Sequence, residues 1–229
     1  MNHAAYEGTS GTSSDVPPSP HAIQHRRTIG AFYTPLSLTE ALCDWGLRSK
    51  EDLALEPCFG GCTFLEAAVS RLRSLGQHRP EQNLFGCDID PLAFRFLKSK
   101  LGVDTKPSHF SACDFLTLTP HAIGGRLVDL AAGNPPFIRP QNFTRNQRAI
   151  IDQWTHTYGI KLGGRASLWA YFVIHATHFL KRGGRVAWVL PNSFLTARYA
   201  TAVRNFLVSK FARVEVITLS ERLFISEGT

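Results

Sequence analysis

The stretch Asn134-Pro135-Pro136-Phe137 holds the residue types that most clearly suggest chemistry. It follows residues 127–132, a short apolar run that predicts a buried strand. The Asn134 side-chain oxygen and the Pro135 carbonyl are two acceptors that can bind the two N–H bonds of a planar amino group, and Phe137 adds an aromatic ring. The two prolines end the strand and stiffen the turn. A plain strand-ending turn with a capping Asn is the alternative interpretation.

A glycine turn follows the first predicted strand. Residues 53–68 predict a short strand, a turn and a helix, and Gly60 and Gly61 let the turn approach a ligand because they carry no Cβ. The glycine spacing does not match the dinucleotide fingerprint, and the chain contains no Gly-x-x-x-x-Gly-Lys-Ser/Thr loop. Hydrolysis of nucleoside triphosphates therefore has no support in the sequence.

Acidic residues end the next two predicted strands. The strand in residues 83–90 ends in Asp88 and Asp90, one of which is placed to accept hydrogen bonds from ribose hydroxyls. Capping of the next helix is the alternative role of Asp90. The strand in residues 108–116 ends in the pair Asp114-Phe115. Because parallel strands end at one edge of a sheet, the glycine turn and the acids could together cradle a cofactor that contains adenosine.

Strands and helices alternate along the rest of the chain. Helices are predicted at residues 38–47, 63–75, 91–100, 145–154, 167–180 and about 193–211, and further strands at 185–190 and 214–219. Residues 181–184 predict the C-cap of the helix at 167–180. This alternation predicts an α/β fold whose mainly parallel sheet is covered on both faces. Residues 1–27, rich in Ser, Thr, Gly and Pro, predict a disordered tail before one domain at 28–229.

The net charge of +7 and the pI of about 9.4 fit a polyanionic partner. Residues 138–165 interleave basic with aromatic residues, a pattern that suits a nucleic-acid groove, with an ordinary exposed loop as the alternative. The residues concerned are Arg139, Arg145, Arg148, Lys161, Arg165, Phe143, Trp154, His156 and Tyr158. No apolar run reaches the roughly 18 residues of a membrane span, and the N-terminus lacks a secretory signal, so we expect a cytoplasmic protein without membrane contact.

The five cysteines are predicted to be reduced thiols, because they are odd in number and have no framework spacing. Cys58, Cys62, Cys87 and Cys113 fall at predicted strand ends, which makes a zinc site conceivable. No Cys-x-x-Cys pair occurs among them, so small residues lining a pocket is the favoured interpretation and no metal is predicted.

In combination, these motifs resemble those of the Rossmann-like DNA adenine-N6 methyltransferases, which use S-adenosylmethionine. The order of the motifs matches the gamma-type group, in which the cofactor motifs precede Asn-Pro-Pro, and Phe32-Tyr33-Thr34-Pro35 matches the extra N-terminal motif of that group. The resemblance covers about residues 28–227. It implies a class I methyltransferase fold, S-adenosylmethionine as cofactor, and methyl transfer to a DNA adenine flipped out of the helix, as in restriction-modification systems.

The resemblance also assigns roles along the cofactor. The implied contacts run from its methionine end to its adenine end: Tyr33 and Thr34 near the methionine, Glu56 and Gly60 at the methionine and sulfonium, Asp88 at the ribose, and Ile89, Asp114 and Phe115 at the adenine. On the substrate side, Asn134 and Pro135 would bind the N6 amino group. Phe137 would stack on one face of the base and Phe224 on the other. The two acceptors would favour a pyramidal nitrogen and aim its lone pair at the methyl group.

The sequence departs from the family pattern in places. Cys62 stands where a further glycine is expected, and Glu56 replaces the more common aspartate. Neither the final antiparallel strand nor a target-recognition region is expected before Thr229. We therefore expect an incomplete catalytic domain, which a separate target-recognition chain could serve.

Two other functions remain open. A methyltransferase acting on RNA or on a protein glutamine is one, because Asn-Pro-Pro-aromatic suits any planar NH2 group; the Phe32-Tyr33-Thr34-Pro35 motif argues against it. An inactive remnant or subunit of a methyltransferase is the other.

Overall fold

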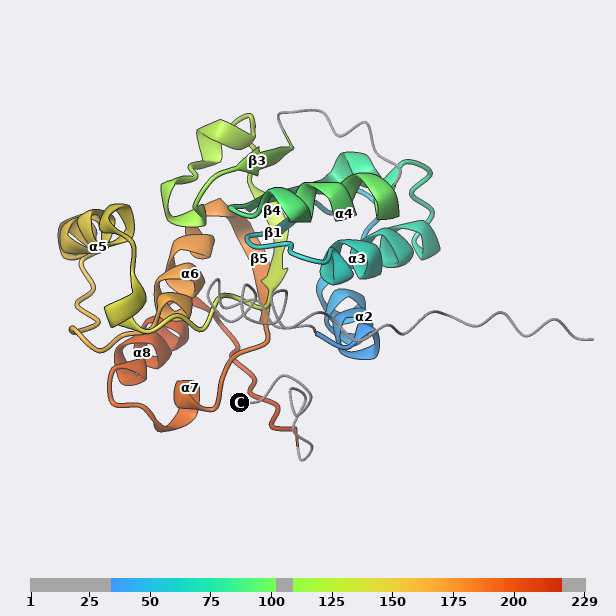
Figure 1. Cartoon of the computed structure of the whole chain (residues 1–229). Helices are drawn as coiled ribbons and strands as arrows, with labels where there is room; N and C mark the ends of the chain where they lie inside the picture. Colours follow the sequence, from blue (N-terminus) through green and yellow to red (C-terminus); the bar gives the residue numbers. More distant parts are fainter. Residues whose placement is uncertain (1–33, 102–108, 220–229) are drawn as a thin grey trace, which may run out of the picture.

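A parallel sheet of five strands forms the centre of the computed structural model, which describes residues 34–101 and 109–219. The strands are β1 (Ala54–Glu56), β2 (Leu84–Asp88), β3 (Phe110–Ala112), β4 (Val128–Gly133) and β5 (Leu180–Trp188). They lie in the order β3-β2-β1-β4-β5, and each neighbouring pair is parallel (Figure 1). The prediction of a Rossmann-like, doubly wound parallel sheet is confirmed for this part of the chain.

Helices cover both faces of the sheet (Figure 1). One face carries α2 (Leu36–Gly46), α3 (Thr63–Ser74) and α4 (Pro91–Leu101), and the other carries α6 (Leu168–Ala176) and α8 (Ala200–Lys210), with α5 (Arg145–Tyr158) beyond them. A short helix α7 (Ser193–Thr196) precedes α8. The 3-10 turns are η1 (Pro80–Asn83), η2 (Phe115–Thr117), η3 (Pro120–Ile123), η4 (Pro140–Asn142) and η5 (Thr177–Phe179).

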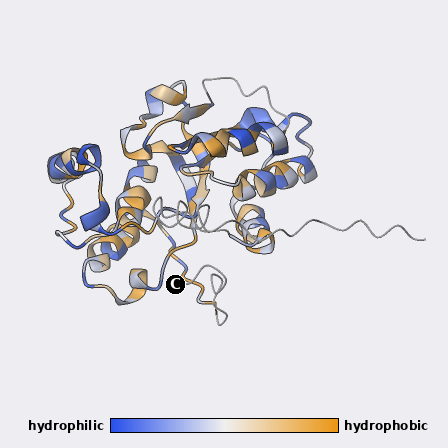
Figure 2. Cartoon of the chain, in the orientation of Figure 1, coloured by the Kyte–Doolittle hydropathy of each residue, from blue (hydrophilic) through white to orange (hydrophobic). Residues whose placement is uncertain are grey.

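Alternation along the strands explains this two-sided cover. Ala54 and Leu84 point into the core beneath α3, whereas Leu55 and Phe85, one position further along, point into the core around α6. Every residue of α6 is buried, as its almost wholly apolar sequence requires. Figure 2 shows the opposite character for α5, where hydrophilic residues gather.

The prediction that residues 181–184 cap a helix is wrong. Helix α6 ends at Ala176, η5 follows, and residues 181–184 lie within β5. The register explains why: Leu180 pairs with Val128 and Arg185 with Leu130, so the residues between them bulge out of the ladder. The positive φ of Gly183, +80°, serves this bulge and not a helix end.

The elements near residues 191–219 also differ from the prediction. The helix expected there is divided into α7 and α8. Earlier in the chain, α5 continues beyond its predicted end at residue 154 to Tyr158. The strand predicted at 214–219 is wrong, since those residues are exposed and paired with no strand. A strand needs a hydrogen-bonding neighbour, and the outer edge of β5 meets none within residues 34–101 and 109–219. The predicted tail, residues 1–27, lies outside the described residues. None of the described helices has the length and apolar character that crossing a membrane requires.

Candidate active site

The carboxyl ends of β1 and β4 flank the point where the strand order reverses. From β1 the chain moves outward to β2 and β3, then returns to β4 on the other side of β1 and continues to β5. In open α/β sheets this switch point is where ligands bind. Across it, the Cys58 thiol donates a hydrogen bond of 3.3 Å to the main-chain oxygen of Asn134. The glycine turn and the Asn-Pro-Pro turn therefore lie side by side.

The Asn134 side chain is held by one end only. Its Nδ2 donates to Thr34 Oγ1 at 3.1 Å, and Thr34, at the start of α2, is itself buried. Its Oδ1 is buried and accepts no hydrogen bond from the described residues. An unpartnered buried acceptor is costly, so its presence here indicates a site that a ligand donor completes.

The chain beyond Asn134 is anchored to the core. Pro135 is buried, and Phe137 is partly buried against the core around α6. The carbonyl of Ile138 accepts two hydrogen bonds, 2.9 Å from the Leu168 N–H and 2.8 Å from the Ser167 hydroxyl, at the start of α6. These bonds fix the chain after the turn, and a hydrogen bond of 3.0 Å from the Val189 N–H to the Gly133 carbonyl fixes it before the turn, so the turn is preorganised.

The glycine turn and Asp88 form one hydrogen-bonded unit. The Gly60 N–H, at φ +42°, donates to Asp88 Oδ2 at 2.8 Å, and the Asp90 N–H donates to Asp88 Oδ1 at 2.8 Å. Burial raises the pKa of Asp88, while these backbone bonds act against that shift. Asp90 Oδ1 accepts the Leu92 N–H at 2.9 Å, which confirms the helix-capping role left open for Asp90.

Two residues near this unit bear on the expected cofactor contacts. Ile89 follows β2 with 54% of its surface exposed, so it presents an apolar side chain at the strand end. Cys62, which stands in the expected glycine position, has a φ of +66°, the one positive value at a non-glycine in the described ranges. The left-handed conformation that favours glycine is therefore kept although the side chain changed.

Glu56 ends β1 beneath the glycine turn with its side chain buried. Its Oε2 has no hydrogen-bond partner in the part of the chain that the structure describes. Burial, and then the charge of Asp88, hold the pKa of Glu56 well above its ordinary value. A carboxyl in this state fits a cationic or hydrogen-bond-donating ligand group.

Glu56→Gln should change stability in a pH-dependent way. The pKa of Glu56 is higher in the folded state than its ordinary value of 4.5, so its contribution to stability is full below that value and is lost as pH rises through the folded pKa. The variant should therefore have the same free energy of unfolding as the wild type at about pH 4, and it should become more stable than the wild type as pH rises. Urea unfolding across this range measures the difference in the free energy of unfolding. A difference that stays constant with pH would contradict the burial of an ionisable group here.

β3 ends at Ala112, earlier than the predicted strand, so Asp114 and Phe115 follow it: Asp114 caps η2 and Phe115 begins it, and their side chains point in different directions. Asp114 Oδ1 accepts the Leu116 N–H at 3.0 Å, and Oδ2 accepts Gln147 Nε2 at 2.7 Å. The Phe115 ring lies in the core, with ring centroids of Phe172, His175 and Phe179 at 5.1, 4.8 and 5.4 Å. Any contact of Phe115 with a ligand at this edge is therefore left to its main chain.

Gln147 contacts the candidate site residue Asp114, and the sequence did not predict this contact. The signal at Gln147 was the spacing Thr144-x-x-Gln147, which is that of a capping box at a helix start. The spacing predicts the cap but not the contact with Asp114, which lies 33 positions earlier in the chain.

The basic and aromatic stretch at 138–165 divides between surface and core. Phe143 and Trp154 are buried, so the interpretation of these aromatic residues as a nucleic-acid stacking surface is wrong for them. The amphipathic α5 turns Trp154 toward Tyr171 and His175, with ring centroids 5.1 and 6.2 Å away. The cations remain exposed: Arg139, Arg145, Arg148, Lys161 and Arg165.

The cysteines at the strand ends do not gather into one cluster. Cys87 and Cys113 contact each other, and a hydrogen bond from Cys87 is the main cause that lowers the pKa of Cys113 to about 7. Cys62 packs on the opposite face of the sheet, beneath α3. Within residues 34–101 and 109–219, no group of three His, Cys, Asp or Glu side chains is arranged for a metal.

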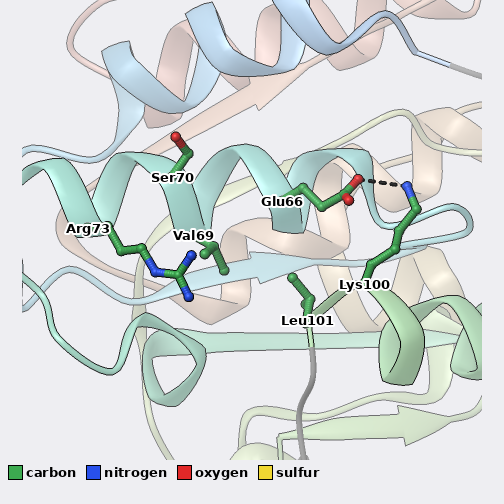
Figure 3. A pocket seen from close by; sticks show the side chains of 6 residues that line it. All are labelled: Glu66, Val69, Ser70, Arg73, Lys100 and Leu101. Atoms are coloured by element: carbon green, nitrogen blue, oxygen red, sulfur yellow. Dashed lines mark hydrogen bonds and ion pairs between the residues drawn. The ribbon is translucent and has the colours of Figure 1, made fainter. Parts of the chain in front are cut away.

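A surface hollow of about 290 Å³ lies apart from these residues, between α3 and α4. Figure 3 shows its lining, including the Lys100 Nζ to Glu66 Oε2 contact of 2.7 Å. None of the predicted site residues lines it. Two predicted site residues, Tyr33 and Phe224, lie outside the described residues.

The structure has a Rossmann-like α/β fold, and solved structures share this fold. The type IIG restriction endonuclease BpuSI superposes with a TM-score of 0.64 at 20% identity, over 82% of this chain and 23% of that one. A type I restriction-modification methyltransferase subunit from Streptococcus thermophilus superposes with a TM-score of 0.61 at 20% identity, over 82% of this chain and 41% of that one.

The family model described as N-6 DNA Methylase matches residues 19–229, and the chain belongs to this family. Among curated relatives, the type II methyltransferase M.AccI of Acinetobacter calcoaceticus is 25% identical over 206 residues, 89% of this chain and 36% of the relative. The type II methyltransferase M.TthHB8I of Thermus thermophilus is 26% identical over 212 residues, which are 90% of this chain and 44% of the relative. The chain thus spans less than half the length of these relatives.

Proposed function

We propose that the chain carries the catalytic site of a methyltransferase that moves a methyl group from S-adenosylmethionine to the N6 amino group of adenine in DNA. The observation that carries this proposal is the buried, unpartnered Oδ1 of Asn134 beside Pro135, at the switch point of the sheet. Membership of the N-6 DNA methylase family and the names of the type II methyltransferase relatives support the same reaction.

The acceptors of the Asn-Pro-Pro turn supply the chemistry. Adenine N6 is a poor nucleophile, because its lone pair is delocalised into the ring. Hydrogen bonds from its two N–H groups to Asn134 Oδ1 and to the Pro135 carbonyl favour a pyramidal nitrogen whose lone pair is free to react. These acceptors are fixed before the substrate arrives, so they need no reorganisation during the reaction. A strong base is not required first, because the N–H becomes acidic only as the new bond forms.

Thr34 acts as a positioning residue in this proposal. Its hydroxyl accepts from Asn134 Nδ2 at 3.1 Å, so the amide presents its oxygen, not its nitrogen, to the substrate. The reverse orientation would place a donor against the substrate N–H bonds. The resemblance also implies that Thr34 lies near the methionine part of the cofactor, and this contact stays a prediction.

S-adenosylmethionine would supply an electrophilic methyl group on a positively charged sulfur. The side chains present fit this group: the buried Glu56 Oε2 lacks a donor, which the cofactor's ammonium group would provide. Gly60 and Asp88 form the unit for the ribose, and the exposed Ile89 offers an apolar surface for the adenine. Asp114 would accept from the adenine amino group.

DNA is the proposed polyanionic partner. The exposed cations of residues 139–165 are suited to phosphate contacts, and a duplex adenine must be flipped out to reach Asn134. Phe137 is the proposed stacking residue on one face of the base, and Phe224 stays the prediction for the other. Recognition of the target sequence by a separate chain also stays a proposal.

Labelled methyl transfer to three acceptors tests this function. We expect incorporation into a random-sequence DNA library, and none above background into matched RNA or a glutamine peptide. All three acceptors carry a planar NH2 group that the Asn-Pro-Pro turn could bind. The comparison therefore distinguishes substrates that the geometry of the turn does not distinguish. Transfer to the glutamine peptide or the RNA, without transfer to DNA, would replace the proposed function with the alternative methyltransferase.

A further inference from the structure

The contact between α5 and the turn after β3 involves a buried polar side chain. Gln147, in the first turn of α5, has only 4% of its surface exposed. Its Nε2 donates to Asp114 Oδ2 at 2.7 Å, a short bond to a charged acceptor. Both the oxygen and the nitrogen of a buried amide need hydrogen-bond partners, so the partner of the Gln147 oxygen explains why the nitrogen faces Asp114.

The helix cap of α5 fixes which end of Gln147 faces Asp114. Gln147 Oε1 accepts the Thr144 N–H at 3.0 Å, and the Thr144 hydroxyl accepts the Gln147 N–H at 3.1 Å. This is the reciprocal capping box of a helix start. Because the amide oxygen is held by the cap, the amide NH2 is the end that must point to Asp114.

Asp114 is thereby held from two directions. Its Oδ1 accepts the Leu116 N–H at 3.0 Å, within its own turn, and its Oδ2 receives the Gln147 donor from a different element. With only one of these bonds, the carboxylate could still rotate about its side-chain torsions. With both bonds the carboxylate has one orientation, and each oxygen keeps a second lone pair for a ligand.

We propose that Gln147 is a positioning residue for cofactor binding: it orients Asp114 as the acceptor for the adenine amino group of S-adenosylmethionine. This inference rests on the proposed function, in which Asp114 binds that amino group. It makes the docking of α5 a determinant of cofactor affinity, although α5 itself does not reach the cofactor in this account. In the alternative, Gln147 has a purely structural role and only attaches α5 to the core. The experiment must distinguish this role from the positioning of Asp114.

Gln147→Glu separates the two roles. Glutamate is the usual alternative to glutamine in a capping box, so the cap with Thr144 is kept. The donor to Asp114 is lost, and two carboxylates at this separation cannot both be charged without a large cost. At low pH one shared proton restores a hydrogen bond between them, and at high pH it is lost.

The measurement is the dissociation constant of S-adenosylmethionine by calorimetry, from about pH 5 to about pH 8, for wild type and variant. We expect the variant to bind about tenfold or more weakly than wild type at the high end and to approach wild type at the low end. Gln147→Ala should bind more weakly at every pH, with a constant ratio. Gln153→Glu, the same chemical change at an exposed position of α5, is the matched control and should follow wild type.

Each outcome has a distinct meaning. A Gln147→Glu ratio that does not change with pH, or affinity equal to wild type throughout, would overturn the positioning role while leaving the proposed function intact. If the wild type itself does not bind S-adenosylmethionine at any pH, the proposed function fails, and the inference fails with it. Circular dichroism melting on the same samples confirms that the compared variants are folded. If Gln147→Glu unfolds at high pH, Gln147→Ala is compared with Thr144→Ala, which removes the hydroxyl of the cap but keeps the Gln147 donor; equal losses of affinity would overturn the positioning role.

Discussion

Asn134→Ala is expected to lower the rate of methyl transfer about 10²–10³-fold, the range found when one preorganised hydrogen-bonding group is removed from an active site. The alanine removes the buried Oδ1 that completes the acceptor pair, so the N6 lone pair stays delocalised. Among the described residues proposed to contact the cofactor, Thr34 is the one hydrogen-bonded to the Asn134 side chain, and the others lie at or just after the carboxyl ends of β1, β2 and β3. The dissociation constant of S-adenosylmethionine should therefore stay within about threefold of wild type.

Two measurements on purified protein check this expectation: single-turnover transfer with labelled cofactor, and calorimetry with the cofactor alone. Thr34→Val is the informative companion, because it keeps Asn134 but removes the hydroxyl that accepts its Nδ2 at 3.1 Å. We expect an intermediate loss of transfer, about tenfold, from an amide that is free to turn its nitrogen toward the substrate. If Asn134→Ala weakens cofactor binding as much as transfer, its role as a substrate acceptor is misassigned.

The second large effect is expected for Asp88→Ala, and here the order of losses reverses. Asp88 accepts from Gly60 and Asp90 at 2.8 Å each, so its removal takes away the proposed ribose acceptor and also loosens the glycine turn. Hydrogen bonds to charged groups contribute about 1.5–3 kcal/mol, so cofactor affinity should fall about 10–100-fold. Saturating cofactor should recover part of the transfer rate.

Asp90→Ala provides a matched control two residues away. Asp90 caps α4 through the Leu92 N–H, so its loss should cost about 0.5–2 kcal/mol of stability, a typical cap energy. Its effect on the cofactor dissociation constant should be small. The assignment of Asp88 to the ribose would be rejected by an unchanged dissociation constant in Asp88→Ala, or by an equal loss in Asp90→Ala.

Local patterns predicted the elements that carry the site. Apolar runs that end in glycine, acid or proline mark the ends of β1, β2 and β4, and these signals need only neighbouring residues. The same signals misled where a contact distant in sequence decides the structure. Residues 181–184 read as a helix end because Gly183-Gly184 follows an apolar helix, yet their pairing with β4 makes them a bulge in β5.

The contacts that orient the site could not be predicted from the sequence. Thr34 and Asn134 are 100 positions apart, and Asp114 and Gln147 are 33 positions apart. Each sequence signal gave a local role, a turn or a cap, and the three-dimensional fold added the second partner. The burial of Glu56, with no donor to its Oε2 among the described residues, is a similar case, because the residue type at a strand end does not reveal how completely its surroundings exclude water.

The most direct test of the central claim is the identity of the methylated atom. A random-sequence DNA library is incubated with the protein and S-adenosylmethionine labelled in the methyl group, then digested to nucleosides and separated by chromatography with mass detection. We expect label in N6-methyldeoxyadenosine, with Asn134→Ala reducing that peak about 10²–10³-fold. Label in a methylated cytosine, or no label above the level that Asn134→Ala gives, would contradict it.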